Sequence, residues 1–293
     1  MSNHTLSSLE EKSKGFPWVR FIISLVLNIS VPVGLFWKLA PNRLHVELGM
    51  GIGPILGVAL LMGIPLSFFE YFYHRYVLHA VVIPFLRSQY VAHTLHHGLT
   101  PAYVPVDRKN PTKLVRVLRF IYPITLREQE KAMHFPFWSL QVFYLIFAVT
   151  LGIPFSIFFP NAPIWIGFLV AVTVYYSYYE IWHAILHLPF DKFWKKGLER
   201  SKFVRRTYTF HLIHHWNEQT NMAIVGFWGI AIPDYVLGTI LLPKRIPLLG
   251  EEVCYNDQAI DPPRQPVRYF DSLQKYKLEK KAKSALEERR RNS

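Results

Sequence analysis

The chain of 293 residues carries a formal net charge of +13, yet only 18% of its residues are charged, while 51% are hydrophobic and 16% are aromatic. The apolar residues are gathered in long blocks, which excludes an ordinary soluble globule and favours a membrane protein. A single cysteine, Cys254, excludes both an intramolecular disulfide and a metal site built from several thiolates.

Four membrane-spanning helices are predicted. Phe21 to Trp37 is uncharged and long enough to cross a bilayer, and Leu48 to Phe69 is a second uncharged stretch whose glycines and prolines predict a kinked, closely packed helix. No residue from Phe135 to Tyr179 is charged, and the turn at Pro160 to Pro163 predicts a hairpin of two further spans. Met222 to Leu242 is apolar but broken by glycines, a proline and an aspartate, so we expect it to be buried or interfacial.

The positive charge is concentrated in two segments that follow the span pairs. They contain Arg108, Lys109, Lys113, Arg116, Arg119, Arg127 and Lys131, and Lys192, Lys195, Lys196, Arg200, Lys202, Arg205 and Arg206. The opposite loops carry only Lys38 and Arg43, so the positive-inside rule predicts cytosolic termini and cytosolic basic segments. Attraction to anionic lipid headgroups accounts for this charge, and no basic groove motif indicates a nucleic-acid partner.

Ten of the thirteen histidines fall in four clusters. An H-x4-H pair follows the second span, an H-x3-H pair follows the fourth, and an H-x2-H-H triple comes after each pair. Two such triples in one chain indicate selection for chemistry. The clustered residues are His74, His79, His93, His96, His97, His183, His187, His211, His214 and His215. The other three, His4, His45 and His134, are interpreted as structural.

The spacing predicts how the clustered imidazoles are presented. Residues three and four apart share a helix face, so each triple and the H-x3-H pair can point one way. His74 and His79 are five apart, which requires either a local π-type bulge or different metals for the two rings. Because each span pair returns the chain to the same side, all four clusters can meet there. Ten imidazoles exceed the roughly four to six ligands of one ion, so we expect two ions.

Polar residues near the clusters are predicted to support the ligands. Glu70 lies four residues before His74, on the same helix face, where it can accept a proton from the imidazole and fix its tautomer. Glu180 lies three residues before His183 and can do the same. A snorkelling interface charge is the alternative for both carboxylates. Further supporting candidates, which could equally stabilise turns, are Asp234, Asn217 and Asn221.

At these residues the chain resembles the fatty acid hydroxylase/sterol desaturase superfamily of membrane di-iron enzymes. The histidine order, the run Glu70-Tyr-Phe-Tyr-His-Arg, Asn221, Gly226 and the segment Pro233 to Thr239 are similar to its motifs. The resemblance implies two Fe²⁺ ions held by the ten clustered histidines, O2 as co-substrate and a separate electron donor, either a cytochrome or a ferredoxin with its reductase. Fatty acid 2-hydroxylases, alkylglycerol monooxygenases, sterol oxidases and desaturases all remain open.

We therefore expect an all-α, multi-pass membrane protein with four transmembrane helices and a cytosolic helical cap. Residues 1–15 are a polar N-terminal segment, residues 16–245 a hydroxylase/desaturase-like catalytic domain and residues 246–293 a charged C-terminal tail. The expected function is oxygen-dependent hydroxylation or desaturation of a lipid alkyl or sterol-like C–H bond. A zinc-dependent membrane hydrolase and a histidine-cluster metal transporter or sensor are the alternatives. The expected location is a bacterial inner membrane, with the endoplasmic reticulum as the alternative.

Overall fold

The computed structural model describes residues 16–100, 132, 134–188, 193–242 and 261–291. Within these ranges every regular element is a helix, and the only strand-like pairing is one isolated bridge between Phe227 and Ile230. The predicted all-α fold is confirmed to that extent. Residues 1–15, the basic residues from Arg108 to Lys131, Lys192 and Cys254 lie outside the described residues.

Four helical segments are long and apolar enough to cross a membrane, as predicted. They are α2 (Trp18–Leu39), α4 (Ile52–Tyr73) continued by η1 (His74–Leu78), α7 (Ser139–Phe147) continued by η3 (Ala148–Gly152) and α8 (Ile153–Phe158), and α9 (Ile164–Leu186). The second and fourth run beyond the predicted ends at Phe69 and Tyr179. Both continue because the polar residues that follow are buried and hydrogen-bonded inside the protein, so falling hydropathy does not end the helix.

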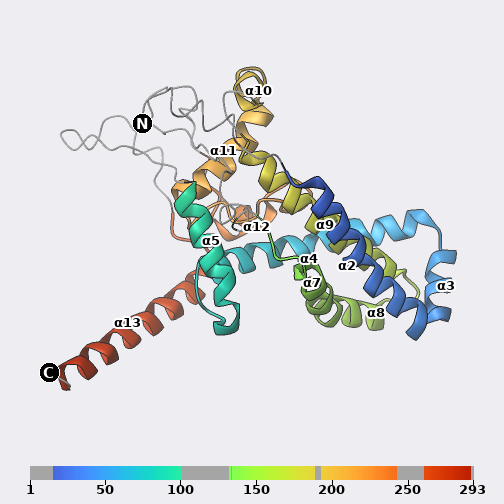
Figure 1. Ribbon diagram of the computed structural model, residues 1–293, viewed down its shortest axis with the longest axis horizontal. Coiled ribbons are helices and arrows are strands. Elements are labelled where there is room, and N and C mark those ends of the chain that lie inside the picture. Colours follow the sequence, from blue (N-terminus) through green and yellow to red (C-terminus); the bar gives the residue numbers. More distant parts are fainter. Residues whose placement is uncertain (1–15, 101–131, 133, 189–192, 243–260, 292–293) are drawn as a thin grey trace.

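The core lies where α4, α7 and α9 pack together (Figure 1). Its buried side chains include Ala59, Met62 and Leu66 of α4, Leu140, Tyr144 and Phe147 of α7, and Phe168, Ala171 and Val172 of α9. Gly167 allows the close approach of α4, because a Cβ atom there would lie 2.5 Å from Cγ1 of Val58. The outer faces of the spanning helices expose large apolar side chains, as lipid contact requires.

One end of the bundle is tied together by Arg43. This residue lies on the short helix α3 (Pro41–Gly49), which joins the first two spans and was not predicted. Its guanidinium donates to the carbonyl oxygens of Pro160 at 2.6 Å and Ala162 at 2.9 Å, and it pairs with buried Glu47 at 2.8 Å. The two interhelical loops therefore meet at one end, which leaves the histidine-bearing ends of α4 and α9 at the other.

Shorter helices cover the histidine-bearing end. They are η2 (Pro84–Leu86), α5 (Arg87–Leu99), α10 (Lys195–Arg200), α11 (Lys202–Trp216) and α12 (Ile232–Leu237). The apolar stretch that begins at Met222 contains only α12 and is largely buried, as predicted. The last helix, α13 (Val267–Arg291), projects away from the body in Figure 1 and is attached through Asp271, which pairs with Arg75 at 2.5 Å.

Replacing Gly167 with alanine is expected to weaken the α4–α9 contact, because the added methyl group overlaps Val58 and approaches the carbonyl oxygen of Ile55 at 3.2 Å. Overpacking of this kind costs about 1–3 kcal/mol, so the thermal midpoint in detergent should fall. Gly57→Ala is the matched control, since a Cβ there meets nothing within 4 Å. Equal midpoints for the two variants would contradict the close packing at Gly167.

Candidate metal centre

The ten clustered histidines converge into two groups of five, and the ligand nitrogens of each group lie within 4.8 Å of one another. Site A contains His74, His79, His93, His97 and His214, and site B contains His96, His183, His187, His211 and His215. The sites are neighbours, because the ring centroids of His97 and His215 are 4.1 Å apart. Each site can hold a metal ion, so the sequence prediction of two clustered sites agrees with the geometry.

The nitrogen spacing suits a bound cation. In site A, Nε2 of His93 lies 3.0 Å from Nε2 of His74 and of His79 and 3.1 Å from that of His97. In site B, Nε2 of His211 lies 2.9 Å from that of His187 and 3.1 Å from that of His215. Metal–imidazole bonds of about 2.1 Å at right angles would place neighbouring nitrogens about 3 Å apart. The donor set therefore fits two ions that prefer imidazole.

A π-helical turn resolves the five-residue spacing of His74 and His79. The backbone N–H of His79 donates to the carbonyl oxygen of His74, five residues back, at 3.1 Å, and η1 spans the residues between them. The two rings stack with centroids 5.0 Å apart, and both belong to site A. The first of the two predicted solutions, a π-type bulge, is therefore the one observed.

The middle histidine of each triple does not join its neighbours, so the three rings that the spacing allowed to point one way divide between the two sites. His93 and His97 lie four residues apart on α5 and share site A, whereas His96 enters site B. On α11, His211 and His215 share site B, and His214 enters site A. The middle residue is only one position from the last, so its side chain points about 100° around the helix. Each triple therefore bridges both sites.

Backbone carbonyls set the tautomers of three ligands. Nδ1 of His74 lies 2.6 Å from the carbonyl oxygen of Met222, and Nδ1 of His214 lies 2.9 Å from that of Thr220. Nδ1 of His215 lies 3.1 Å from the carbonyl oxygen of Thr100. Because a carbonyl only accepts, each Nδ1 must carry the proton, which leaves the Nε2 lone pair directed into the site. No sequence pattern marks these carbonyls, so sequence reasoning missed them.

Asp234 supports site A through one of these carbonyls. Its carboxylate accepts hydrogen bonds from the backbone N–H groups of Met222 and Ala223, each at 2.8 Å, and from the hydroxyl of Thr239 at 2.8 Å. It thereby holds the segment whose Met222 carbonyl orients His74. Burial raises the pKa of Asp234 to about 6, and the hydrogen bonds oppose that rise. The expected supporting role is therefore exerted indirectly, through the backbone.

Glu70 and Glu180 do not lie where we expected them. Glu70 accepts hydrogen bonds from the Tyr175 hydroxyl at 2.7 Å and from the backbone N–H groups of Val225 and Gly226, so it joins α4 to α9 and to the segment between α11 and α12. His74 uses the Met222 carbonyl instead. The carboxylate of Glu180 lies 2.9 Å from Nδ1 of His134. His134, interpreted as structural, is thus the partner of a buried acid beside the sites.

The two asparagines shape the loop after α11. Asn217 ends the helix and its side-chain oxygen accepts from the backbone N–H of Gln219 at 3.1 Å, which is a turn-capping role. Asn221 has a positive φ of 55°, and its amide bonds the backbone of Phe210 and Leu241. Both residues hold the loop that contains the Thr220 carbonyl, and neither side chain is a member of site A or site B.

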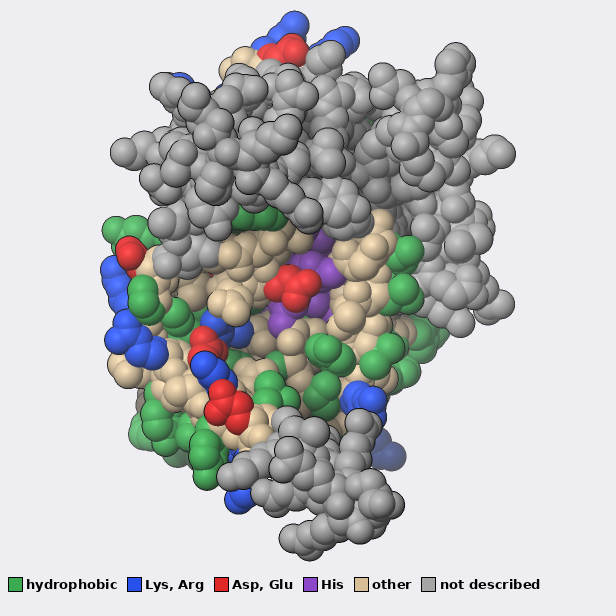
Figure 2. All heavy atoms as spheres, turned by 90° about the vertical axis from the view of Figure 1, so that its left-hand side faces the viewer, with side chains coloured by type: hydrophobic (Ala, Val, Ile, Leu, Met, Phe, Trp, Pro, Cys, Tyr) green, Lys and Arg blue, Asp and Glu red, His purple; other side chains and the backbone are tan. Residues whose placement is uncertain are grey.

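Glu218 is a site residue that the sequence analysis missed. Its half-exposed carboxylate lies 3.3 Å from Nδ1 of His79 and 3.6 Å from Nδ1 of His97, both in site A. Figure 2 shows acidic side chains over the histidines where these reach the surface. Thr100 contacts His215 of site B in the same way, with its hydroxyl 3.0 Å from Nδ1. Glu218 and Thr100 each lie three residues after the last histidine of a triple. This repeated spacing could have identified both as residues that contact the ligands.

The buried imidazoles are neutral at physiological pH. Burial lowers the pKa of seven site histidines outside the spanning helices well below the usual range, and neighbouring imidazoles lower it further. These residues are His93, His96, His97, His187, His211, His214 and His215. Neutral imidazole is the form that binds a metal ion, so no proton has to be displaced.

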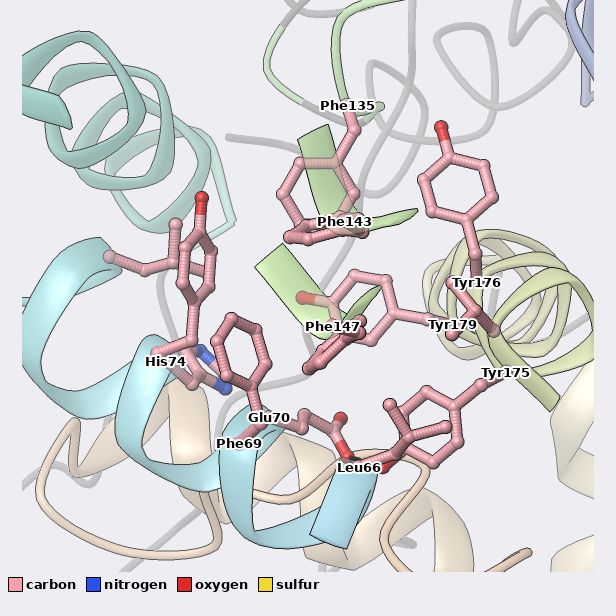
Figure 3. A pocket seen from close by; sticks show the side chains of 13 residues that line it. Leu66, Phe69, Glu70, His74, Phe135, Phe143, Phe147, Tyr175, Tyr176 and Tyr179 are labelled. Carbon is pink, nitrogen blue, oxygen red and sulfur yellow. Dashed lines mark hydrogen bonds between the residues drawn. The ribbon is translucent and has the colours of Figure 1, made fainter. Parts of the chain in front are cut away.

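An apolar cavity reaches site A from among the spanning helices (Figure 3). We call this narrow space of about 50 Å³ the aromatic pocket. Phe135, Phe143, Phe147, Tyr176 and Tyr179 line one side, and Glu70 and His74 lie on the α4 side. The shape and lining suit an alkyl chain, and His74 places one edge of site A in its wall.

Comparison with known proteins gives no family assignment. No family model matches the chain, and neither a curated protein nor a solved structure does. The function is therefore inferred from the site itself.

Acid is expected to destabilise the metal-free protein. Below about pH 6.5 the unfolded chain protonates its histidines, whereas the seven folded ones with a lowered pKa stay neutral. Their stabilisation is therefore present above that pH and is lost as the pH falls. The raised pKa of Asp234 increases the stability of the folded state as the pH falls, but the seven histidines outnumber this single carboxylate. Thermal midpoints in detergent should fall from pH 7.5 to 5.5, and a midpoint that rises over this range would contradict the neutral cluster.

Removing the carboxylate of Glu218 is expected to weaken site A selectively. Loss of a group that orients metal ligands costs about tenfold or more in metal affinity, so Glu218→Gln should release one ion to a chelator before the other. Glu199→Gln, at an exposed position of α10, is the control and should match the parent protein. Equal release of both ions from the Glu218 variant would show that this carboxylate does not orient the ligands of site A.

Proposed function

We propose that the protein is a membrane-bound di-iron oxidoreductase of the fatty acid hydroxylase/sterol desaturase type, which uses O2 to hydroxylate or desaturate an alkyl C–H bond of a lipid. The observation that carries the proposal is the pairing of two adjacent five-imidazole sites with an aromatic pocket among the spanning helices. Imidazole suits iron, copper, nickel and zinc. Two all-histidine sites exceed what a zinc hydrolase needs, since one zinc with three ligands suffices there.

The residues of the chain would bind and orient the reactants. Site A and site B would hold the two ions, whose contribution when bound is the activation of O2 for C–H oxidation. The carbonyls of Met222, Thr220 and Thr100 keep Nε2 directed into the sites. The aromatic pocket would hold the alkyl chain and exclude water beside His74.

The overall reaction sets the requirement for a partner. Hydroxylation consumes a C–H bond, one O2, two electrons and two protons, and yields an alcohol and one water. Desaturation consumes the same oxidant and electrons and yields an alkene and two waters. The electrons would come from a separate donor, a cytochrome or a ferredoxin with its reductase. A metal transporter is disfavoured because the sites lie together at one end of the bundle instead of lining a path across it.

Iron loading of the purified protein is expected to give about two iron atoms per chain, as two imidazole sites require. Lipid addition with a reductant should then consume O2. His97→Ala should lower both the iron content and the oxygen consumption, whereas His45→Ala, outside the two sites, should leave both unchanged. Lipid hydrolysis without oxygen consumption, together with tightly bound zinc, would instead establish the hydrolase alternative.

A further inference from the structure

The face of α9 that bears Tyr178 and Trp182 borders a separate cavity of about 380 Å³. This space, which we call the outer cavity, lies between α9, α11, α12 and the segment from Ala223 to Ile232. Among the described residues that line it, none also lines the aromatic pocket and none is one of the ten site histidines. A molecule bound in the outer cavity would therefore be distinct from the substrate of the proposed reaction.

The outer cavity continues the lipid-facing surface of α9. Val174 of this spanning helix is 47% exposed, as expected of a side chain that contacts lipid chains. Tyr178 and Trp182 follow it at intervals of four residues, so the three side chains share one helix face. The cavity lies at the histidine-bearing end of that face. Tyrosine and tryptophan are typical of the boundary between lipid chains and headgroups.

The rim of the outer cavity is apolar and exposed. Phe203 of α11, Ile230 and Tyr235 of α12 line the cavity, and they are 72%, 60% and 70% exposed. Exposed apolar side chains that gather around a cavity mark a surface that binds lipid or protein. Because this surface continues the lipid-facing side of α9, an acyl chain is the occupant that it favours.

A positive charge lies at the same rim. Arg206 and Thr207 of α11 both line the outer cavity, and Arg206 is exposed. An arginine guanidinium binds phosphate oxygens with paired hydrogen bonds, and basic residues next to a spanning helix attract anionic headgroups. Cations in site A and site B would act in the same direction. The outer cavity is therefore complementary to both parts of an anionic phospholipid, its charged headgroup and its apolar chain.

We propose that the outer cavity binds an anionic phospholipid of the bilayer, with its phosphate at Arg206 and one acyl chain against Tyr178 and Trp182. The bound lipid joins α9, α11 and α12, and it thereby attaches the helices that cover the histidine-bearing end to a spanning helix. The proposal goes beyond the proposed function, because this lipid is a bound component of the protein and is not the molecule oxidised.

Native mass spectrometry of the metal-free full chain in neutral detergent tests the proposal without requiring activity. The probes are phosphatidylglycerol and phosphatidylcholine with the same acyl chains. Phosphatidylglycerol should bind at one saturable site and about fivefold more tightly, the preference expected from one basic residue beside an anionic headgroup. Excess glycerol 3-phosphate, which carries the charge without the chains, should not displace it. Equal affinities for the two lipids, or displacement by glycerol 3-phosphate, would overturn the proposal.

Substitutions in α11 locate the site. Arg206→Gln should lower the affinity for phosphatidylglycerol about fivefold and remove the preference for it. Arg200→Gln is the matched control and should bind like the parent protein, because this exposed arginine of α10 does not line the cavity. An equal loss of affinity in the two arginine variants would assign the effect to general charge and overturn the site at Arg206.

A second variant tests the apolar part of the outer cavity. Thr207→Phe should fill part of the space and weaken the binding of both lipids. The native hydroxyl bonds the carbonyl oxygen of Phe203 in its own helix, so the fold does not depend on it. Parent-like binding of both lipids by the folded Thr207 variant would overturn the proposal. Because no metal is present, these results are independent of the iron content and oxygen consumption that test the proposed function.

Discussion

The histidine-bearing end of the protein depends on one electrostatic constraint, the direction of imidazole lone pairs into two small buried spaces. Carbonyl acceptors fix the proton of His74, His214 and His215 on Nδ1, and the Glu218 carboxylate does the same for His79. The Nε2 atoms of His79 and His214, which lie 3.1 Å apart, therefore both carry lone pairs. Facing lone pairs repel, and protonating a buried imidazole introduces a costly charge. A cation bound in each site would accept these lone pairs and remove the repulsion.

The middle histidine of each triple, His96 or His214, belongs to the other site from its two neighbours, which makes the two halves of the chain interdependent. Site A takes His214 from α11, and site B takes His96 from α5, so neither half supplies a complete set of five ligands. The stacking of His97 on His215 brings the sites together. The fold must therefore bring both span pairs together before either site is complete. The close α4–α9 packing at Gly167 and the loop contacts of Arg43 join the two pairs, and through this they contribute to assembling the sites at the opposite end.

Much of this could be predicted from the sequence, because hydropathy and histidine spacing are local signals. The spanning helices and the convergence of the ten histidines follow from them, and so does the π-helical turn between His74 and His79 as one of two alternatives. The crossing of His96 and His214 could not be predicted, since it depends on where two neighbouring sites lie around α5 and α11. The partners of Glu70 and Glu180 depend on tertiary contacts with residues distant in the sequence.

X-ray absorption at the iron edge of the iron-loaded protein tests the central claim most directly. Two all-histidine sites predict a first shell of mainly nitrogen neighbours at about 2.1 Å, with strong multiple scattering from imidazole rings and no sulfur. His97→Ala should reduce the imidazole contribution. A shell of oxygen neighbours without imidazole scattering would contradict the assignment of the ten histidines as ligands of two metal ions.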